Sequence, residues 1–218
     1  GAYEFFGLDR ATIRLGFDYG ISKDLSIGIG RGDYKKEFDG FLKYRAIHQS
    51  VGPGSIPFSL ILVGGSTLQT LKVNNESRTF SNRMSYYGQI VAGRKFSDAF
   101  SFQIIPTIVH RNLVPTAEDP NDTYAIGLGG RIKLTRRVSF NVDYYIVTNK
   151  DKSLTTYNPF SIGFDLETGG HVFQLHLTNA IGMNERAFIT ETTNNWGHGD
   201  IQIGFNISRA FQVKKRKL

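Results

Sequence analysis

Residues 123–134, TYAIGLGGRIKL, decide the fold class of this chain. Large apolar side chains alternate with small or polar ones, and this period of two predicts a β-strand. One face carries Tyr124, Ile126, Leu128, Ile132 and Leu134, and the other carries Thr123, Ala125, Gly127, Gly129, Arg131 and Lys133. A soluble barrel buries its apolar face, whereas a membrane barrel turns that face outward to lipid. Because small and charged residues do not suit a dry core, the segment predicts a membrane strand with its polar face toward a lumen.

The same alternation recurs along the whole chain. Residues 138–148 and 199–210 again set apolar side chains against polar ones such as Asn141, Asp143 and Asn206. Besides 123–134, the remaining alternating runs are 11–21, 25–30, 38–47, 57–69, 83–94, 100–110, 158–167 and 170–178. Together these runs predict an all-β fold, an antiparallel up-and-down transmembrane β-barrel.

The lengths of the connections support this interpretation, because outer-membrane barrels have short periplasmic turns and longer outer loops. Short links fall at 22–24, 95–99, 135–137 and 168–169, and they alternate with longer ones at 31–37, 70–82, 111–122, 149–157 and 179–198. The link at 48–56 is the exception, since it is long but falls on the short-turn side.

The strand count is odd, whereas bacterial single-chain barrels have an even number. We therefore expect about 12 strands, of which about 11 are visible and one N-terminal strand is missing before Gly1. Residues 1–10 are then the outer loop that joins the missing strand to the first visible one. On this interpretation residues 1–218 are a single, N-terminally truncated transmembrane β-barrel domain.

Composition agrees with this fold class. The chain has 24 glycines, 17 phenylalanines and 10 tyrosines, a net charge of +7 and no cysteine. No window reaches the roughly 18 consecutive apolar residues of a spanning helix, which excludes a helical membrane protein. The absence of cysteine fits a protein of the oxidising cell envelope.

Several long phrases resemble an uncharacterised β-barrel family of Bacteroidota, classified only as a domain of unknown function. They include EFFGLDRATIRLGFDYGISKDLSIGIGR, DGFLKYR, PTIVHRNLVP, YAIGLGGRIKLT, FDLETGGHVFQLHLTNA and NWGHGDIQIGFNISR. Members of that family resemble outer-membrane proteins, begin with a signal peptide and have a segment ahead of the equivalent of Gly1. The resemblance implies a location in the bacterial outer membrane, in contact with its lipid. It implies no activity, ligand or cofactor.

The charged residues on the polar faces are the candidate lumen lining. They are Arg14, Asp18, Asp39, Lys43, Arg45, Arg94, Arg131, Lys133, Asp143 and Asp165. One hypothesis is a positive lumen that favours anions. The other is an ion-paired network, joined by Glu37 and Glu167, that fills a narrow barrel.

The long loop at 179–198 is unusually apolar for a surface loop, since it contains Met183, Phe188, Ile189 and Trp196. We expect these residues to form a plug in the barrel mouth or a docking surface for a partner protein. The alternative is a loop that packs on its own barrel rim.

No catalytic, cofactor or metal site is expected. His171 and His176 are five residues apart, so they lie on opposite faces of a strand and do not share an ion. The sequence shows no recognisable pair of nucleophile and base. We therefore expect a protein without enzymatic activity, with an outer-membrane hydrolase as the alternative. Nucleic-acid binding is not expected, because the basic residues alternate with lipid-facing ones.

Two functions follow from these observations. The first is a narrow, porin-like pore or transporter for small solutes, with anions preferred if the positive lumen dominates. The alternative is an occluded barrel that acts as a structural or accessory subunit of an envelope protein complex, in contact with other envelope proteins.

Overall fold

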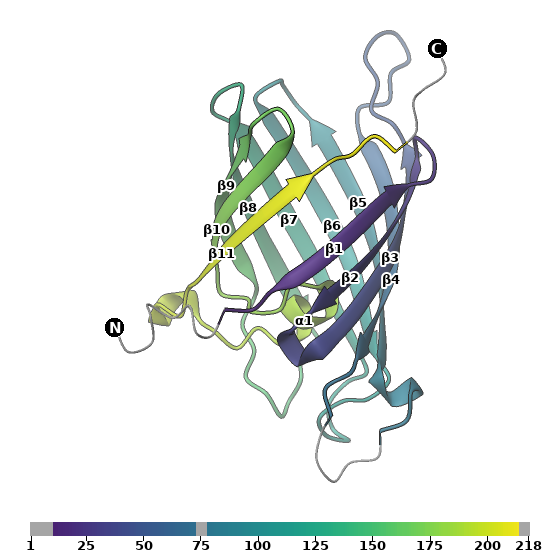
Figure 1. The fold of residues 1–218 in the computed structure, drawn as a ribbon, viewed down its shortest axis with the longest axis vertical. Coiled ribbons are helices and arrows are strands. Elements are labelled where there is room, and N and C mark those ends of the chain that lie inside the picture. The colour runs from purple at the N-terminus through teal and green to yellow at the C-terminus, as the bar shows by residue number, and fades with distance from the viewer. Residues whose placement is uncertain (1–10, 73–77, 214–218) are drawn as a thin grey trace.

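The computed structural model describes residues 11–72 and 78–213, and these form one antiparallel sheet of eleven strands that curls into a barrel (Figure 1). Each strand pairs with the next one along the chain, so the topology is up-and-down as predicted. The strands are β1 (Arg14–Gly20), β2 (Leu25–Gly32), β3 (Glu37–Ile47), β4 (Ser59–Gln69), β5 (Met84–Lys95), β6 (Phe100–Arg111), β7 (Asp122–Lys133), β8 (Val138–Thr148), β9 (Phe160–Glu167), β10 (His171–Thr178) and β11 (Gln202–Arg209).

The two faces of β7 have the predicted orientation. Thr123 and Ala125 are buried inside the barrel, whereas Tyr124 and Ile126 are exposed on its outside. The paired strands show the same order, because Ile126 lies opposite Ile146 of β8 in the sheet and both face outward. A continuous apolar outer surface therefore surrounds the barrel, as lipid contact requires.

The barrel has two different ends (Figure 1). At the turn end, short links join β1 to β2, β5 to β6, β7 to β8 and β9 to β10. The longer link between β3 and β4 also lies at this end, where Gln49 pairs with Lys95: its Nε2 donates to the Lys95 carbonyl at 2.8 Å, and its Oε1 accepts from the Lys95 amide at 2.8 Å. The long connections form the opposite end, the loop end.

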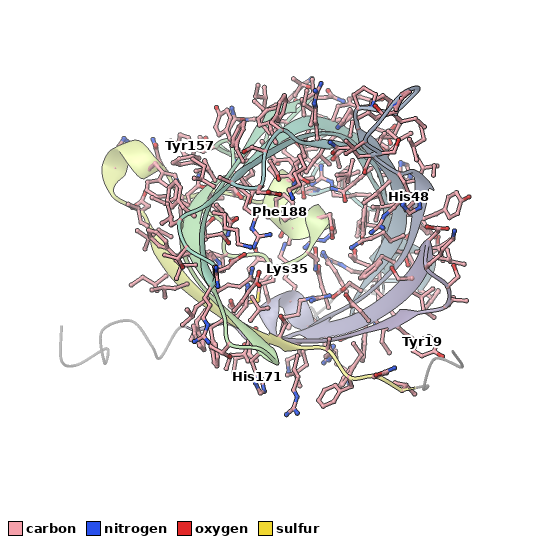
Figure 2. The ribbon with its side chains drawn as sticks, turned by 90° about the horizontal axis from the view of Figure 1, so that it is seen from above. Tyr19, Lys35, His48, Tyr157, His171 and Phe188 are labelled. Carbon is pink, nitrogen blue, oxygen red and sulfur yellow. The ribbon has the colours of Figure 1, made fainter. Side chains whose placement is uncertain are left out.

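Short helical turns occupy the loop end. They are η2 (Tyr34–Lys36), η3 (Ser81–Arg83), α1 (Glu185–Thr190) and η4 (Trp196–His198). Of these, α1 is turned into the barrel, and Figure 2 shows Phe188 and Lys35 within the ring of strands, whereas Tyr19 points away from it. In the described part of the chain, no helix has the length and apolar character needed to cross a membrane.

The sheet has two free edges, because β1 and β11 do not pair with each other in the described structure. Both strands run from the loop end to the turn end, since Arg14 lies opposite Gly32 and Gln202 lies opposite Thr178. Their outward side chains are more exposed than those of inner strands: Phe17 is 73% and Ile203 is 77% exposed, against 49% for Ile126. An open seam therefore runs along the barrel wall.

Candidate functional site

The site is built around α1, whose two ends are both fixed by side-chain hydrogen bonds. Asn184 caps its N-terminus, because the Asn184 Oδ1 accepts from the Ala187 amide at 2.9 Å. At the other end, the hydroxyl groups of Thr190 and Thr192 donate to the Arg186 and Phe188 carbonyls. These hydrogen bonds fix a six-residue helix that would be too short to persist alone.

One face of α1 packs on an apolar belt inside the barrel. The belt is formed by the inward side chains of five neighbouring strands, Val63, Tyr87, Val109, Ala125 and Val147. Ile189 seals it and is only 1% exposed, and the Phe188 ring meets the Tyr145 ring edge-on with centroids 5.0 Å apart. The lumen is therefore not polar throughout, because the inner faces of β4 to β8 form a small dry core with α1.

Buried charge also holds α1 in place. The guanidinium of Arg186, 1% exposed, lies between two carboxylates: its Nη2 is 2.5 Å from Glu37 Oε1, and its Nη1 is 2.5 Å from Glu191 Oε1. Glu37 belongs to β3, so this ion pair joins the loop to the barrel wall.

Three further residues complete what we call the plug network. Lys35 Nζ lies 2.6 Å from Glu191 Oε1, and the Tyr34 hydroxyl donates to Glu191 Oε2 at 3.1 Å. Asn184 Nδ2 donates to Glu37 Oε2 at 2.6 Å. Two cations thus balance two carboxylates, which is the condition for burying charge at acceptable cost.

The pKa values of the network reflect these contacts. Burial alone would favour the neutral acid of Glu191, but Arg186 and Lys35 outweigh it and lower the pKa of Glu191 to about 2. Burial raises the pKa of Tyr34, with the Glu191 charge adding to the effect. Glu185, beside the network, has no basic partner at bonding distance, and burial raises its pKa.

The rest of the loop packs on the rim. Asn179 joins its two ends, since its Nδ2 donates to the carbonyls of Asn158 and Asn194. The Trp196 indole lies outside the lumen, where its Nε1 donates to the Phe160 carbonyl at 3.0 Å. Of the predicted mouth residues, Phe188 and Ile189 therefore enter the barrel, Trp196 packs on the rim, and Met183 is exposed.

Beyond the plug, the turn-end half of the barrel contains a cavity of about 690 Å³, which we call the vestibule. Of the predicted lumen residues, Arg94, Arg131, Asp143 and Asp165 line it. Its other polar lining includes Gln49, Lys95, Ser101, Gln103, Asn141, Ser161, Gln174, His176 and Asn206.

The remaining predicted lumen residues are distributed as follows. Arg14 and Asp39 form an ion pair, with Arg14 Nε 2.9 Å from Asp39 Oδ2, and Arg131 pairs with Glu167 at 2.9 Å. Within the described residues, the other inward-facing members of the set have no ion pair: Asp18, Lys43, Arg45, Lys133, Asp143 and Asp165. The lumen thus combines paired and unpaired charge.

Arg94 borders the vestibule at the turn end of β5. It lies opposite Phe102 of β6 and shares the outward side of β5 with Ile90. Its guanidinium lies over the Phe96 ring, 4.9 Å from the centroid. Arg94 therefore stands at a strand end, where a long basic side chain can extend beyond the barrel wall.

The outer loops are also tied together. Arg111 pairs with Asp151, its Nη1 lying 2.8 Å from Oδ2, and both side chains are nearly fully buried. Asp119 accepts from the amides of Lys152 and Ser153, and hydrogen bonds from Ser153 hold the pKa of Asp119 below its usual range. These contacts make the loops after β6 and β8 one ordered surface.

The structure offers few groups for metal or acyl chemistry. In residues 11–72 and 78–213, no three His, Asp or Glu side chains are grouped to hold a metal ion. His176 faces the vestibule, whereas His171 faces outward beside Phe173. The Ser161 hydroxyl donates to Thr178 Oγ1 at 2.8 Å. A protein without enzymatic activity stays our prediction.

Sequence reasoning missed most of the plug network, namely Tyr34, Lys35, Asn184, Arg186 and Glu191. Asn184 ahead of Glu185 is a recognisable helix start, and it was the available signal for α1. The partners of α1 in the barrel wall, however, depend on how the loop folds back.

Comparison with known proteins agrees with this architecture. A comparison with curated proteins finds no match. Residues 1–211 match the family model described as a membrane bound beta barrel domain (DUF5777). The match covers nearly the whole chain, and the outward apolar face and up-and-down sheet fit its description. The chain therefore belongs to this family of membrane-bound β-barrel domains.

Proposed function

We propose that this protein is an occluded barrel of the bacterial outer membrane, which serves as a structural or accessory subunit of an envelope protein complex. The observation that supports this choice is the seating of α1. Ile189 packs on the apolar belt, and Arg186 of the same helix joins a balanced network of buried charges. An open passive pore has no use for an apolar belt facing its lumen, whereas an occluded barrel needs one to hold its plug.

The ordered loop end favours contact with other proteins. The Arg111–Asp151 pair and the hydrogen bonds of Asp119 hold two loops in one arrangement. Leu113 and Leu154 are exposed on these loops. A rigid surface with apolar side chains loses little conformational entropy when a partner binds.

The second candidate is a narrow pore that opens when α1 moves. The vestibule favours it, because a solute that enters from the turn end can travel as far as the plug. The plug helix α1 belongs to a single loop, between β10 and β11. Movement of that one loop would therefore remove α1 from the lumen. The present arrangement would then be the closed state of a gate.

Single-channel recording in planar bilayers separates the two candidates. We expect the purified protein to be silent, while its fold is checked by heat-modifiable gel mobility. A variant with Ile189→Asp and Arg186→Glu should loosen the plug and produce discrete conductance steps. Steady openings of the unaltered protein would overturn the occluded barrel in favour of the pore, and a salt gradient would then show its ion preference.

The accessory role has its own readout. After mild solubilisation of native membranes, we expect the barrel to migrate as part of a larger assembly in native electrophoresis. Leu113→Asp with Leu154→Asp should release it from that assembly without changing its gel mobility after heating. Migration as a free barrel under all conditions would contradict the accessory role.

A further inference from the structure

The vestibule has a chemical character that neither of these functions requires. We propose that it is a binding site for an uncharged, hydroxyl-rich solute, of the size of a mono- or disaccharide, that enters from the turn end. This inference goes beyond the proposed function and does not depend on it, because a barrel can be occluded with or without a ligand in its open half.

The size and shape of the cavity suit such a ligand. Its volume of about 690 Å³ lies within the range of roughly 300 to 1,000 Å³ that is usual for small-molecule sites. The plug and the apolar belt fill the barrel beyond it, and Ile61 and Val91, which pack against the belt, line the cavity. The site is therefore a pocket and not a segment of a through-channel.

Part of the lining consists of planar polar side chains without partners in the described structure. In the described structure, the side chains of Gln103, Asn141 and Asp143 form no hydrogen bond with another side chain or backbone group. Amides both donate and accept, and carboxylates accept. A hydroxyl-rich ligand can satisfy such a set, because every hydroxyl group donates one hydrogen bond and accepts others.

A second group of polar side chains is already oriented. Gln174 Nε2 donates to Asp165 Oδ1 at 2.9 Å, and Asn206 Nδ2 donates to Gln174 Oε1 at 3.4 Å. This chain crosses β9, β10 and β11 on the inner face. Fixed hydrogen-bond groups lose less entropy on binding than free ones, so they favour recognition of a defined ligand.

Glycines keep this wall open. A Cβ atom on Gly129 would lie 2.7 Å from Gln103 Nε2 and 2.8 Å from Asp143 Oδ1. These two side chains therefore converge over a position that only glycine leaves free. Gly204 does the same for His176, whose ring occupies the space of the missing Cβ.

The charges at this end argue for an uncharged ligand. Lys43, Arg45 and Lys133 face inward near the turn end, while Asp143 and Asp165 are the opposing carboxylates. Arg131 is neutralised by Glu167. Because unpaired charges of both signs face inward at this end of the barrel, we expect neither an anion nor a cation to meet a consistent field, and hydrogen bonding to decide the selection.

Calorimetric titration of the whole protein tests this proposal, in a detergent without a sugar headgroup so that the detergent does not compete. The probes are uncharged saccharides (glucose, maltose, cellobiose and raffinose), with spermidine as the cation and citrate as the anion. We expect saturable heat with at least one saccharide and none with spermidine or citrate. Binding of only a charged probe, or of none of the saccharides, would overturn the proposal.

Two adjacent glycines give matched variants. Gly129→Ala should displace Gln103 and Asp143 and weaken saccharide binding at least tenfold. Gly130→Ala should leave binding unchanged, because nothing lies within 4 Å of a Cβ at that position. Equal affinities of the two folded variants would count against the site. Asp143→Asn should retain most saccharide affinity, since it removes a charge and keeps an acceptor.

The two proposals fail in different experiments. Conductance by the unaltered protein would refute the occluded barrel and leave saccharide binding to be judged by calorimetry. A silent barrel that binds no saccharide would refute only the vestibule site.

Discussion

At the scale of single residues, Arg186 is the side chain on which the plug depends most. Replacing it with methionine would leave Glu37 and Glu191 buried around an uncharged group. Removing one partner of a buried ion pair costs roughly 3 to 5 kcal/mol, because the other charge remains desolvated. We expect Arg186→Met to lower the free energy of unfolding by a corresponding amount. Urea unfolding in lipid vesicles measures this change.

Lys35→Met is the control for this measurement. Lys35 contacts the same carboxylate, but its side chain is 36% exposed, so water can replace much of its contribution. We expect a loss of less than about 1 kcal/mol. Equal losses in the two variants would show that the burial of Arg186 is not what holds the plug.

Two neighbouring glycines test the apolar belt in the same way. A Cβ on Gly65 would collide with the Tyr87 ring, whereas a Cβ on Gly64 has nothing within 4 Å. Tyr87 is a belt member, so Gly65→Ala should destabilise the barrel by roughly 1 to 3 kcal/mol through overpacking, and Gly64→Ala should not. The measurement is urea unfolding followed by tryptophan fluorescence, and identical midpoints for both variants would contradict a tightly packed belt.

The plug network also predicts a response to acid. Glu191 has a pKa of about 2 in the folded protein against 4.5 as its ordinary value, so its stabilising effect is complete above pH 4.5 and is lost as the pH falls toward 2. Glu185 acts in the opposite sense, because its raised pKa favours the folded state at low pH. We expect Glu191→Gln to reduce the acid dependence of stability between pH 4.5 and 2, with Asp119, whose pKa is also lowered, accounting for part of what remains.

Unfolding midpoints measured across this range, for the unaltered protein and for Glu191→Gln, give the result. The Asp98→Asn variant is the control, since Asp98 is fully exposed on a turn. An unaltered acid transition in Glu191→Gln would mean that other carboxylates govern it.

At the scale of elements, the strands were predictable and the plug was not. Alternation predicted all eleven strands, because one face of each strand contacts lipid and the other faces the lumen, and these environments favour different side chains. The bounds differed by a few residues: β11 begins at Gln202 and not at 199, since η4 and the left-handed Gly199 (φ 78°) precede it.

The lumen was harder to predict for a physical reason. Alternation tells which side chains face inward, but Val63 or Val109 on an inner face has the same pattern as any other lumen residue. Their burial depends on Ile189, which is more than 40 positions away along the chain from every belt residue. Arg94 stands at a strand end, where a basic side chain has two environments open to it, the vestibule and the outer rim.

The free edges predict a difference in dynamics between elements. The outward residues of β1 and β11 are more exposed than those of β6 and β7, and one side of each edge strand has no hydrogen-bonded neighbour in the described sheet. Backbone amides without such partners exchange with solvent faster. We expect hydrogen–deuterium exchange in β1 and β11 to be much faster than in β6 and β7. Uniform protection of all these strands would contradict an open seam.

At the scale of the whole molecule, a strand between β1 and β11 would close the barrel. Both edges run from the loop end to the turn end, so a single strand that runs the opposite way is antiparallel to both. A second copy in the same membrane orientation cannot supply it, because its own free edges run in the same direction as these. The twelfth strand therefore stays our prediction, and we expect it to carry apolar residues outward and small or polar residues inward.

Exchange measurements can test this closure directly. In a polypeptide that carries such a strand ahead of residue 1, hydrogen–deuterium exchange should slow in β1 and β11. Their amides should become as protected as those of β6 and β7. A matched polypeptide in which lysine replaces the outward apolar residues of the added strand should keep the fast edges, because lysine at lipid depth opposes insertion. Fast exchange at both edges in the first polypeptide would show that the seam does not accept a twelfth strand and that the eleven strands are the complete wall.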